Sequence, residues 1–173
     1  MKKLIFVFLL LFGWTSMSFA DSSGRAYIPH FYSYYDGTTT FTNFYISNKS
    51  NQSIDVKVAL YGHQNNLGAP NLLADASTSS TSGIIRSPAD LPNYSETTPG
   101  YSATFTLPAY QTTYIQLLPP SSPSGVLEFG YGKIEWSTPT EGISGALLAH
   151  GFARYVSGAY YQSSIIINGG NPF

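Results

Sequence analysis

The chain has 173 residues, of which 43% are hydrophobic, 16% aromatic and only 10% charged. Its eight Lys and Arg are outnumbered by nine Asp and Glu and are scattered singly after Lys3, so the sequence lacks the basic footprint of a nucleic-acid-binding protein. Cysteine is absent, which excludes disulfides, thiol chemistry and cysteine-ligated metal sites.

The N-terminal segment 1–20 has the pattern of a secretory signal peptide. A basic start is followed by an uninterrupted apolar run over 4–12 and by small residues at Ser18 and Ala20. The apolar run is too short for a spanning helix, which needs about 20 residues. We therefore expect cleavage after Ala20, export to the periplasm or the extracellular space, and a mature domain over 21–173 that does not span a membrane.

Period-two alternation dominates the mature part and predicts antiparallel strands with one face in contact with solvent. Residues 53–61 are the clearest case, because Asp55 and Lys57 alternate with aliphatic residues. Turn residues such as Asp36-Gly37 separate the strands. The predicted strands are 26–32, 40–48, 53–61, 101–107, 112–118, 130–137, 146–155 and 160–167. The sequence thus predicts an all-β domain, a single antiparallel β-sandwich of seven to nine strands.

One segment interrupts this pattern. Residues 62–100 have weak periodicity, four prolines and the run Ser77–Ser82. A connection of this length in a compact domain is functional or mobile in most proteins. We expect a long loop or excursion inserted after the third strand and packed over the sandwich.

No motif for catalysis, metal binding or a cofactor is present. Ser144 follows Gly142 but lacks the Gly-x-Ser-x-Gly spacing of a nucleophile elbow. His30, His63 and His150 lack the close spacing of metal ligands. We therefore predict a non-enzymatic protein without a cofactor, and an unrecognised hydrolase that uses His150 remains an alternative.

Two strands that follow one another in the sequence suggest a candidate binding face. If 130–137 and 146–155 form a hairpin through 137–144, their outward side chains make one mixed aromatic and charged patch. These residues are Tyr131, Lys133, Glu135, His150, Phe152 and Arg154. Tyr and Arg are frequent anchors of binding surfaces, although ordinary cross-strand pairing explains the same pattern.

Fourteen tyrosines suggest a further alternative, a carbohydrate-binding module, because exposed rings stack on sugars. Tyr32, Tyr34 and Tyr35 cluster near one turn, and Tyr160 and Tyr161 follow another. Tyrosine is also common in strands for reasons of packing alone.

The C-terminal Phe173 raises the alternative of a small outer-membrane β-barrel, whose last strand commonly ends in an aromatic residue. Gly169, Gly170 and Pro172 interrupt the alternation that a membrane-spanning strand requires. The soluble sandwich is therefore the preferred interpretation.

Residues 41–48, 56–61 and 105–108 resemble small exported bacterial immunoglobulin-like sandwich modules: a strand ends in an Asn-containing turn, an alternating strand follows, and a Leu-Pro corner comes later. The strand pattern is also similar to that of the sensory rhodopsin transducer proteins. These resemblances imply a β-sandwich fold and transfer no functional residue. We expect an exported binding or structural protein whose partner is a protein, a cell surface or a glycan.

Overall fold

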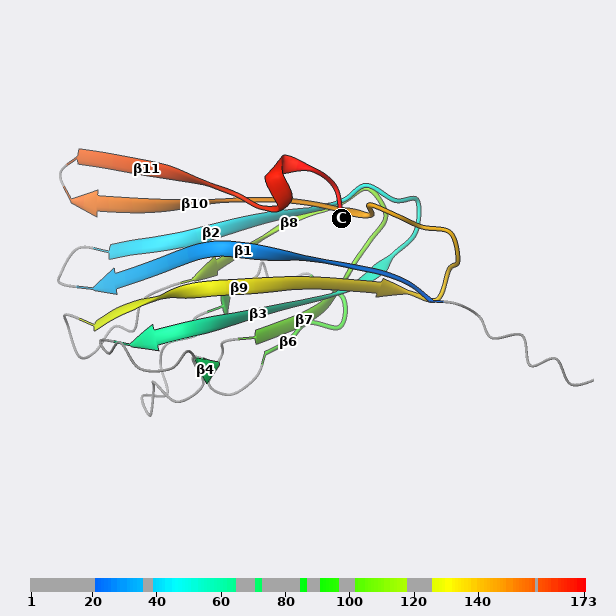
Figure 1. Cartoon of the computed structure of the whole chain (residues 1–173), viewed down its shortest axis with the longest axis horizontal. Coiled ribbons are helices and arrows are strands. Elements are labelled where there is room, and N and C mark those ends of the chain that lie inside the picture. The colour runs from blue at the N-terminus through cyan, green and yellow to red at the C-terminus, as the bar shows by residue number, and fades with distance from the viewer. Residues whose placement is uncertain are drawn as a thin grey trace, which may run out of the picture.

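Eight long strands form the fold, and they correspond to the eight strands predicted from the sequence. They are β1 (Ser22–Tyr35), β2 (Thr39–Asn48), β3 (Ile54–Gln64), β7 (Ser102–Leu107), β8 (Thr112–Leu117), β9 (Val126–Thr138), β10 (Leu147–Ser157) and β11 (Ala159–Ile166) (Figure 1). Three two-residue strands and a short 3₁₀ turn complete the elements: β4 (Asn71–Leu72), β5 (Ile85–Arg86), β6 (Ser95–Glu96) and η2 (Asn168–Gly170). The computed structural model describes residues 21–35, 39–64, 71–72, 85–86, 91–96, 102–117, 126–157 and 159–173.

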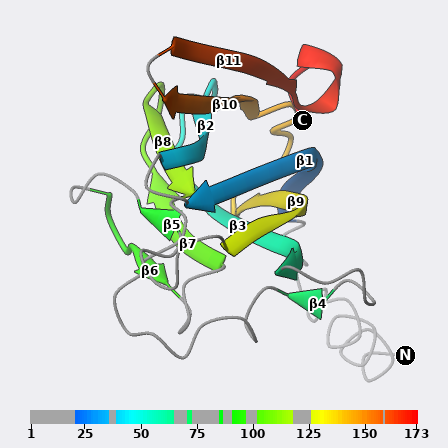
Figure 2. The same ribbon diagram turned by 90° about the vertical axis from the view of Figure 1, so that its left-hand side faces the viewer.

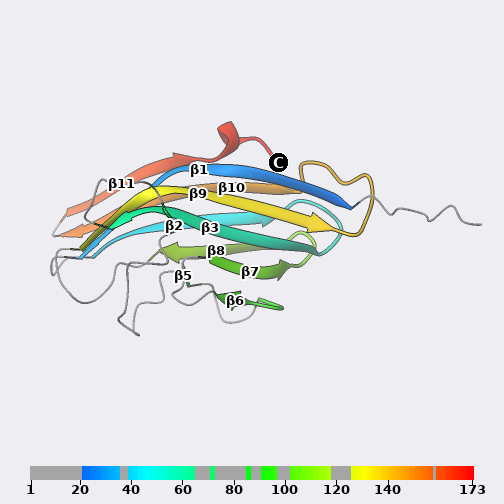
Figure 3. The same cartoon turned by 60° about the horizontal axis from the view of Figure 1, so that its bottom comes forward.

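The long strands form two antiparallel sheets of four strands each, which confirms the predicted β-sandwich. Sheet I has the order β11-β10-β2-β8, and sheet II has the order β1-β9-β3-β7. Among the described residues, the two sheets are joined by the pairing of β1 with β2, at Tyr34 with Thr40 and at Tyr35 with Thr39. Figure 2 shows the two sheets end-on, and Figure 3 shows that their strands run in similar directions, as in aligned sandwiches.

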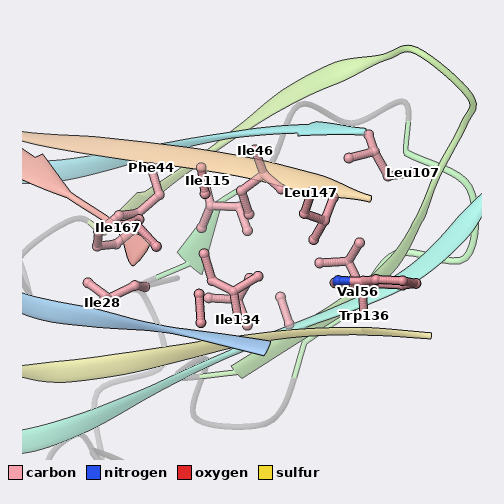
Figure 4. Close-up of a cluster of buried hydrophobic side chains, with 14 of the residues drawn as sticks. Ile28, Phe44, Ile46, Val56, Leu107, Ile115, Ile134, Trp136, Leu147 and Ile167 are labelled. Atoms are coloured by element: carbon pink, nitrogen blue, oxygen red, sulfur yellow. The ribbon is translucent and has the colours of Figure 1, made fainter. Parts of the chain in front are cut away.

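Binary patterning decides which face of each strand is buried. Along β3 the aliphatic side chains of Ile54, Val56, Val58 and Leu60 are buried, whereas Asp55 and Lys57 are exposed, as the sequence predicts. The core lies between the two sheets (Figure 4). Its largest fully buried side chains include Phe31, Phe44 and Phe105, one each from β1, β2 and β7.

β1 contains an irregularity that alters its alternation. Its register with β9 shifts between Ile28 and Phe31, and both of these side chains are buried although an odd number of positions separates them. Pro29 lies in this interval and lacks a backbone N–H, so it cannot donate to the ladder. A bulge at the proline turns Phe31 back toward the core.

Trp136 closes one end of the core. Its indole Nε1 donates to the Phe173 carbonyl oxygen at 2.7 Å, and this oxygen also accepts from the Leu147 backbone N–H at 3.0 Å. A Cβ on Gly24 would lie 2.4 Å from the same Nε1, so the indole fits only because residue 24 lacks a side chain. The Trp136 indole thus connects β9, the start of β10 and the segment after η2.

The predicted insertion over 62–100 is described only in part. β3 continues to Gln64, and the short strands β4 and β6 pair with β3 and β7, whereas β5 pairs with β8. In addition, the Thr106 N–H donates to the Pro92 carbonyl oxygen at 2.8 Å. The rest of the predicted loop lies outside the described residues. The part of the chain that the structure describes contains no helical segment that could span a lipid bilayer.

Candidate binding surfaces

The six residues of the predicted binding face do not form one surface. β9 pairs with β1 and β3 in sheet II, whereas β10 pairs with β2 and β11 in sheet I. The predicted hairpin is therefore wrong. Residues 139–146 carry the chain from one sheet to the other. Three of the six residues, Tyr131, Lys133 and Glu135, lie on the outer face of sheet II, and the other three, His150, Phe152 and Arg154, lie on the outer face of sheet I.

The outer faces of β9 and β10 are separate because the two strands cover the core from opposite sides. Ile134 and Trp136 of β9 and Leu147 and Ala149 of β10 all contribute to the same core, and they enter it from opposite sides. The outward predictions for both strands are thus correct, because alternation fixes which side chains point away from the core. Their outward faces nevertheless point away from each other.

On sheet I, a row of ring and aliphatic side chains crosses all four strands. Tyr114 of β8 is opposite Tyr45 of β2, Tyr45 is opposite His150 of β10, and His150 is opposite Ile166 of β11. Phe152 lies one position further along β10 on the same face. Tyr114 is 41% exposed and Ile166 is 64% exposed. We call these five residues the aromatic face.

The rings of the aromatic face pack against each other. The Tyr45 ring is stacked on His150, with 5.2 Å between centroids and an interplanar angle of 16°, and on Phe152, with 5.9 Å and 25°. Tyr114 is tilted by 47° against Tyr45, at 6.1 Å. The flat sides of the Tyr45 ring are therefore engaged by neighbouring rings of the same protein.

Beside this row, the described residues leave one buried polar atom without a hydrogen-bond partner. Asn43 of β2 lies opposite Phe152 and Gln116, and its Oδ1 accepts no hydrogen bond from any described residue. Most buried polar atoms in proteins are paired, and an unpaired one costs roughly 1–3 kcal/mol. Asn43, which adjoins the aromatic face, is thus a position where the described residues leave a buried acceptor unsatisfied.

The outer face of sheet II is polar and contains an open hollow of about 940 Å³. Across it, Glu135 of β9 is opposite both Arg25 of β1 and Lys57 of β3. Three strands therefore present alternating positive and negative side chains. The hollow is lined by these residues together with Ser23, Gly24, Asp55, Val56, Asn93, Thr104, Phe105, Thr106, Trp136 and Ser137.

Hydrogen bonds fix several groups around this polar hollow. The Asn93 amide donates to Thr106 Oγ1 at 2.9 Å, and the Thr106 hydroxyl donates to Asp55 Oδ1 at 2.8 Å. The Lys133 ammonium pairs with Glu135 Oε1 at 2.8 Å. This hydrogen bond raises the pKa of Lys133 above its ordinary value. The two acidic side chains at the hollow, Asp55 and Glu135, are thus each bound by a neighbouring side chain.

Two tyrosines flank the polar hollow. Tyr131 stacks on Tyr61 of β3, with 5.3 Å between centroids and 16° between planes. Tyr27 is opposite Lys133 and is 57% exposed, and no ring among the described residues stacks on it. A tyrosine of this kind can present the flat side of its ring to a ligand.

His150, the histidine considered for catalysis, stacks on Tyr45 on the exposed aromatic face. Ser144 lies in the connection between β9 and β10, away from any strand. Within the described ranges, no three His, Asp or Glu side chains gather as metal ligands. His63 has no described side chain, and this is also true of Tyr34, Tyr35, Tyr160 and Tyr161 in the predicted tyrosine clusters.

Sequence reasoning missed most members of both surfaces. Tyr45 and Tyr114 alternate with the buried residues Phe44, Ile46 and Ile115, so an outward direction for each was readable from the sequence. What could not be read is that they are neighbours, because β2 and β8 are far apart in the chain. Likewise, alternation predicts the outward direction of Lys57, but it does not reveal that Lys57 and Arg25 lie on either side of Glu135.

The sequence matches no protein-family model, and no curated protein or solved structure is significantly similar to it. The resemblance to immunoglobulin-like modules stays a prediction.

Proposed function

We propose that the chain is an exported, non-enzymatic binding protein that docks a partner protein on the aromatic face of sheet I. The observation that carries the proposal is the row of Tyr114, Tyr45, His150 and Ile166 across four strands. Aromatic side chains supply large contact areas at protein interfaces, and a few of them commonly dominate the binding energy.

Ring geometry favours a protein over a sugar at this face. A sugar stacks on the flat side of an exposed ring, whereas Tyr45 has His150 and Phe152 stacked against it. Ring edges, the Tyr hydroxyls and the exposed Ile166 suit the mixed apolar and polar surface of a partner protein. Export rests on the signal-peptide pattern of residues 1–20.

The first experiment fractionates cells that express the full chain and measures the intact mass. We expect a periplasmic or medium fraction whose mass starts at Asp21. Recovery of the uncleaved chain from membranes alone would contradict export.

Docking is tested with the purified 21–173 chain as bait against envelope and culture-medium proteins of the source cells. A Tyr45→Ser/Tyr114→Ser variant should lose at least tenfold in the recovery of specific partners. Tyr27→Ser, an exposed tyrosine on sheet II, is the matched control and should retain them. Equal recovery of partners by both variants would exclude the aromatic face as the docking surface.

A second candidate function is the binding of a neutral oligosaccharide in the polar hollow. The observation that favours it is the combination of balanced charges from Arg25, Lys57, Asp55 and Glu135 with the nearby Tyr27 ring, on which no described ring stacks. Sugar hydroxyls both donate and accept, so they match a surface that offers both kinds of group. Titration of cellohexaose, chitohexaose and mannohexaose into the 21–173 chain tests this, and Tyr27→Ala should abolish any binding that Tyr114→Ala retains.

A further inference from the structure

Each sheet of a sandwich ends in two edge strands, and exposed edges invite pairing with another chain. In this protein, three of the four edges carry a protecting feature. β8 pairs with β5 on the outside of sheet I, and β7 pairs with β6 on the outside of sheet II. β1 contains Pro29 and a bulge, both of which hinder strand addition.

The fourth edge, β11, has none of these features in the part of the chain that the structure describes. Its sequence, AYYQSSII, contains no charged residue, proline or glycine. Its register with β10 is continuous from Ala159 to Ile166, without a bulge. Beyond β10, no described strand pairs with it. Figure 1 shows β11 as the outermost strand of the molecule on this side.

We propose that β11 pairs with β11 of a second copy of this chain, antiparallel and about a two-fold axis, so that two copies of sheet I become one eight-stranded sheet. Closed two-fold dimers are the commonest form of soluble oligomer. An uncharged edge suits self-pairing, because equal charges would otherwise meet across the axis. The proposal goes beyond the docking of a partner on the aromatic face, since it uses the backbone of the edge.

Strand geometry fixes where the axis can lie. Directly opposed residues of an antiparallel pair point to the same face, so one residue must pair with its own copy. The midpoint of β11 falls between Gln162 and Ser163, and an axis at either residue gives the longest overlap. Both residues are exposed. Ile166, with 64% of its surface exposed, would then be flanked by the second copy.

Sedimentation equilibrium of the 21–173 chain tests the association. We expect a dimer that dissociates on the double substitution Gln162→Lys/Ser164→Lys, which sets like charges opposite each other for an axis at either residue. Thr112→Lys/Gln116→Lys places the same two charges on β8, on the opposite side of sheet I, and should leave the dimer intact. Unchanged far-UV circular dichroism shows that each variant is folded.

Cross-linking tests the axis directly, because the chain has no cysteine of its own. Opposed Cα atoms in antiparallel strands are about 4.5–5.5 Å apart, within the range that a disulfide needs. Gln162→Cys or Ser163→Cys should therefore give a covalent dimer on mild oxidation, whereas Thr112→Cys should not. A monomer at every concentration, a dimer that survives the lysines on β11, or cross-linking at Thr112→Cys alone would overturn the proposal.

The test also separates this proposal from the docking of a partner. The substitutions Tyr45→Ser and Tyr114→Ser leave the β11 edge unchanged, and the lysine pair on β11 leaves both tyrosines in place. A monomeric chain that still captures its partner would contradict only the β11 pairing. A dimer without a captured partner would contradict only the docking face.

Discussion

Asn48 connects three segments of backbone at one end of the sandwich. It is 2% exposed, and the two hydrogens of its Nδ2 are shared among the carbonyl oxygens of Gln52, Leu107 and Pro108, which lie 2.7, 3.0 and 3.0 Å from the nitrogen. Its Oδ1 accepts from the N–H and the hydroxyl of Ser50. One amide thus joins the β2–β3 turn to the corner between β7 and β8.

Substitution of Asn48 by Ala should therefore destabilise the fold strongly. The substitution removes the donor to the buried Leu107 carbonyl oxygen and the acceptor for the Ser50 N–H and hydroxyl. Each buried polar group that is left without a partner costs roughly 1–3 kcal/mol. We expect a loss of at least about 2 kcal/mol in the free energy of unfolding, measured by urea denaturation. Asn51→Ala, at an exposed position of the same turn, is the control and should change stability by less than about 0.5 kcal/mol.

The Lys133–Glu135 pair makes a prediction about pH. The hydrogen bond that the Lys133 ammonium donates to the Glu135 carboxylate raises the pKa of Lys133, so the fold favours the protonated ammonium. This contribution is present below the ordinary lysine pKa and is lost as pH rises through the raised value. In an NMR titration, Glu135→Gln should lower the pKa of Lys133, whereas Glu141→Gln should not. An unchanged titration in Glu135→Gln would show that the pair does not form in solution.

At the scale of elements, the sequence predicted all eight long strands and the inward side of most of them. Alternation is a local property, so Ile54 and Val56 reveal their side of β3 whichever strands lie beside it. Which strands pair with each other, in contrast, depends on residues that are far apart in the sequence. Residues 139–146 lead from sheet II to sheet I, but the same residues could equally well form the turn of a hairpin, so the sequence does not distinguish the two paths. The predicted six-residue binding face is wrong for this reason.

The contact between β10 and β2 depends on the absence of a side chain at Gly151. A Cβ there would lie 2.8 Å from Cδ1 of the buried Phe44 ring and 3.0 Å from the Asn43 carbonyl oxygen. The backbone oxygen cannot move without disturbing the ladder. Gly151→Ala should therefore destabilise the protein by about 1–3 kcal/mol, as overpacked cores do. Ser164→Thr, on the exposed face of β11 opposite Phe152, adds a methyl group where there is room and should leave the thermal midpoint nearly unchanged.

At the scale of the whole molecule, the two sheets share one core, so we expect them to unfold together. Ile28, Ile134 and Val56 of sheet II face Ile46 and Leu147 of sheet I across it (Figure 4). Separation of the sheets would expose both apolar faces to water at about 25 cal/mol for each Å². We therefore expect a single cooperative unit to hold both outer faces.

This coupling can be measured with Trp136, the one tryptophan after residue 20, which reports on sheet II. Ile46→Ala removes buried methyl groups from sheet I and should lower the free energy of unfolding by about 2–5 kcal/mol. Because unfolding of a shared core is all-or-none, the Trp136 fluorescence transition in urea should move by the same amount as the far-UV circular dichroism transition. Lys49→Ala, an exposed control, should move neither. If Ile46→Ala shifted the circular dichroism transition alone, the sheets would unfold separately, and each outer face would then rest on a sheet with a stability of its own.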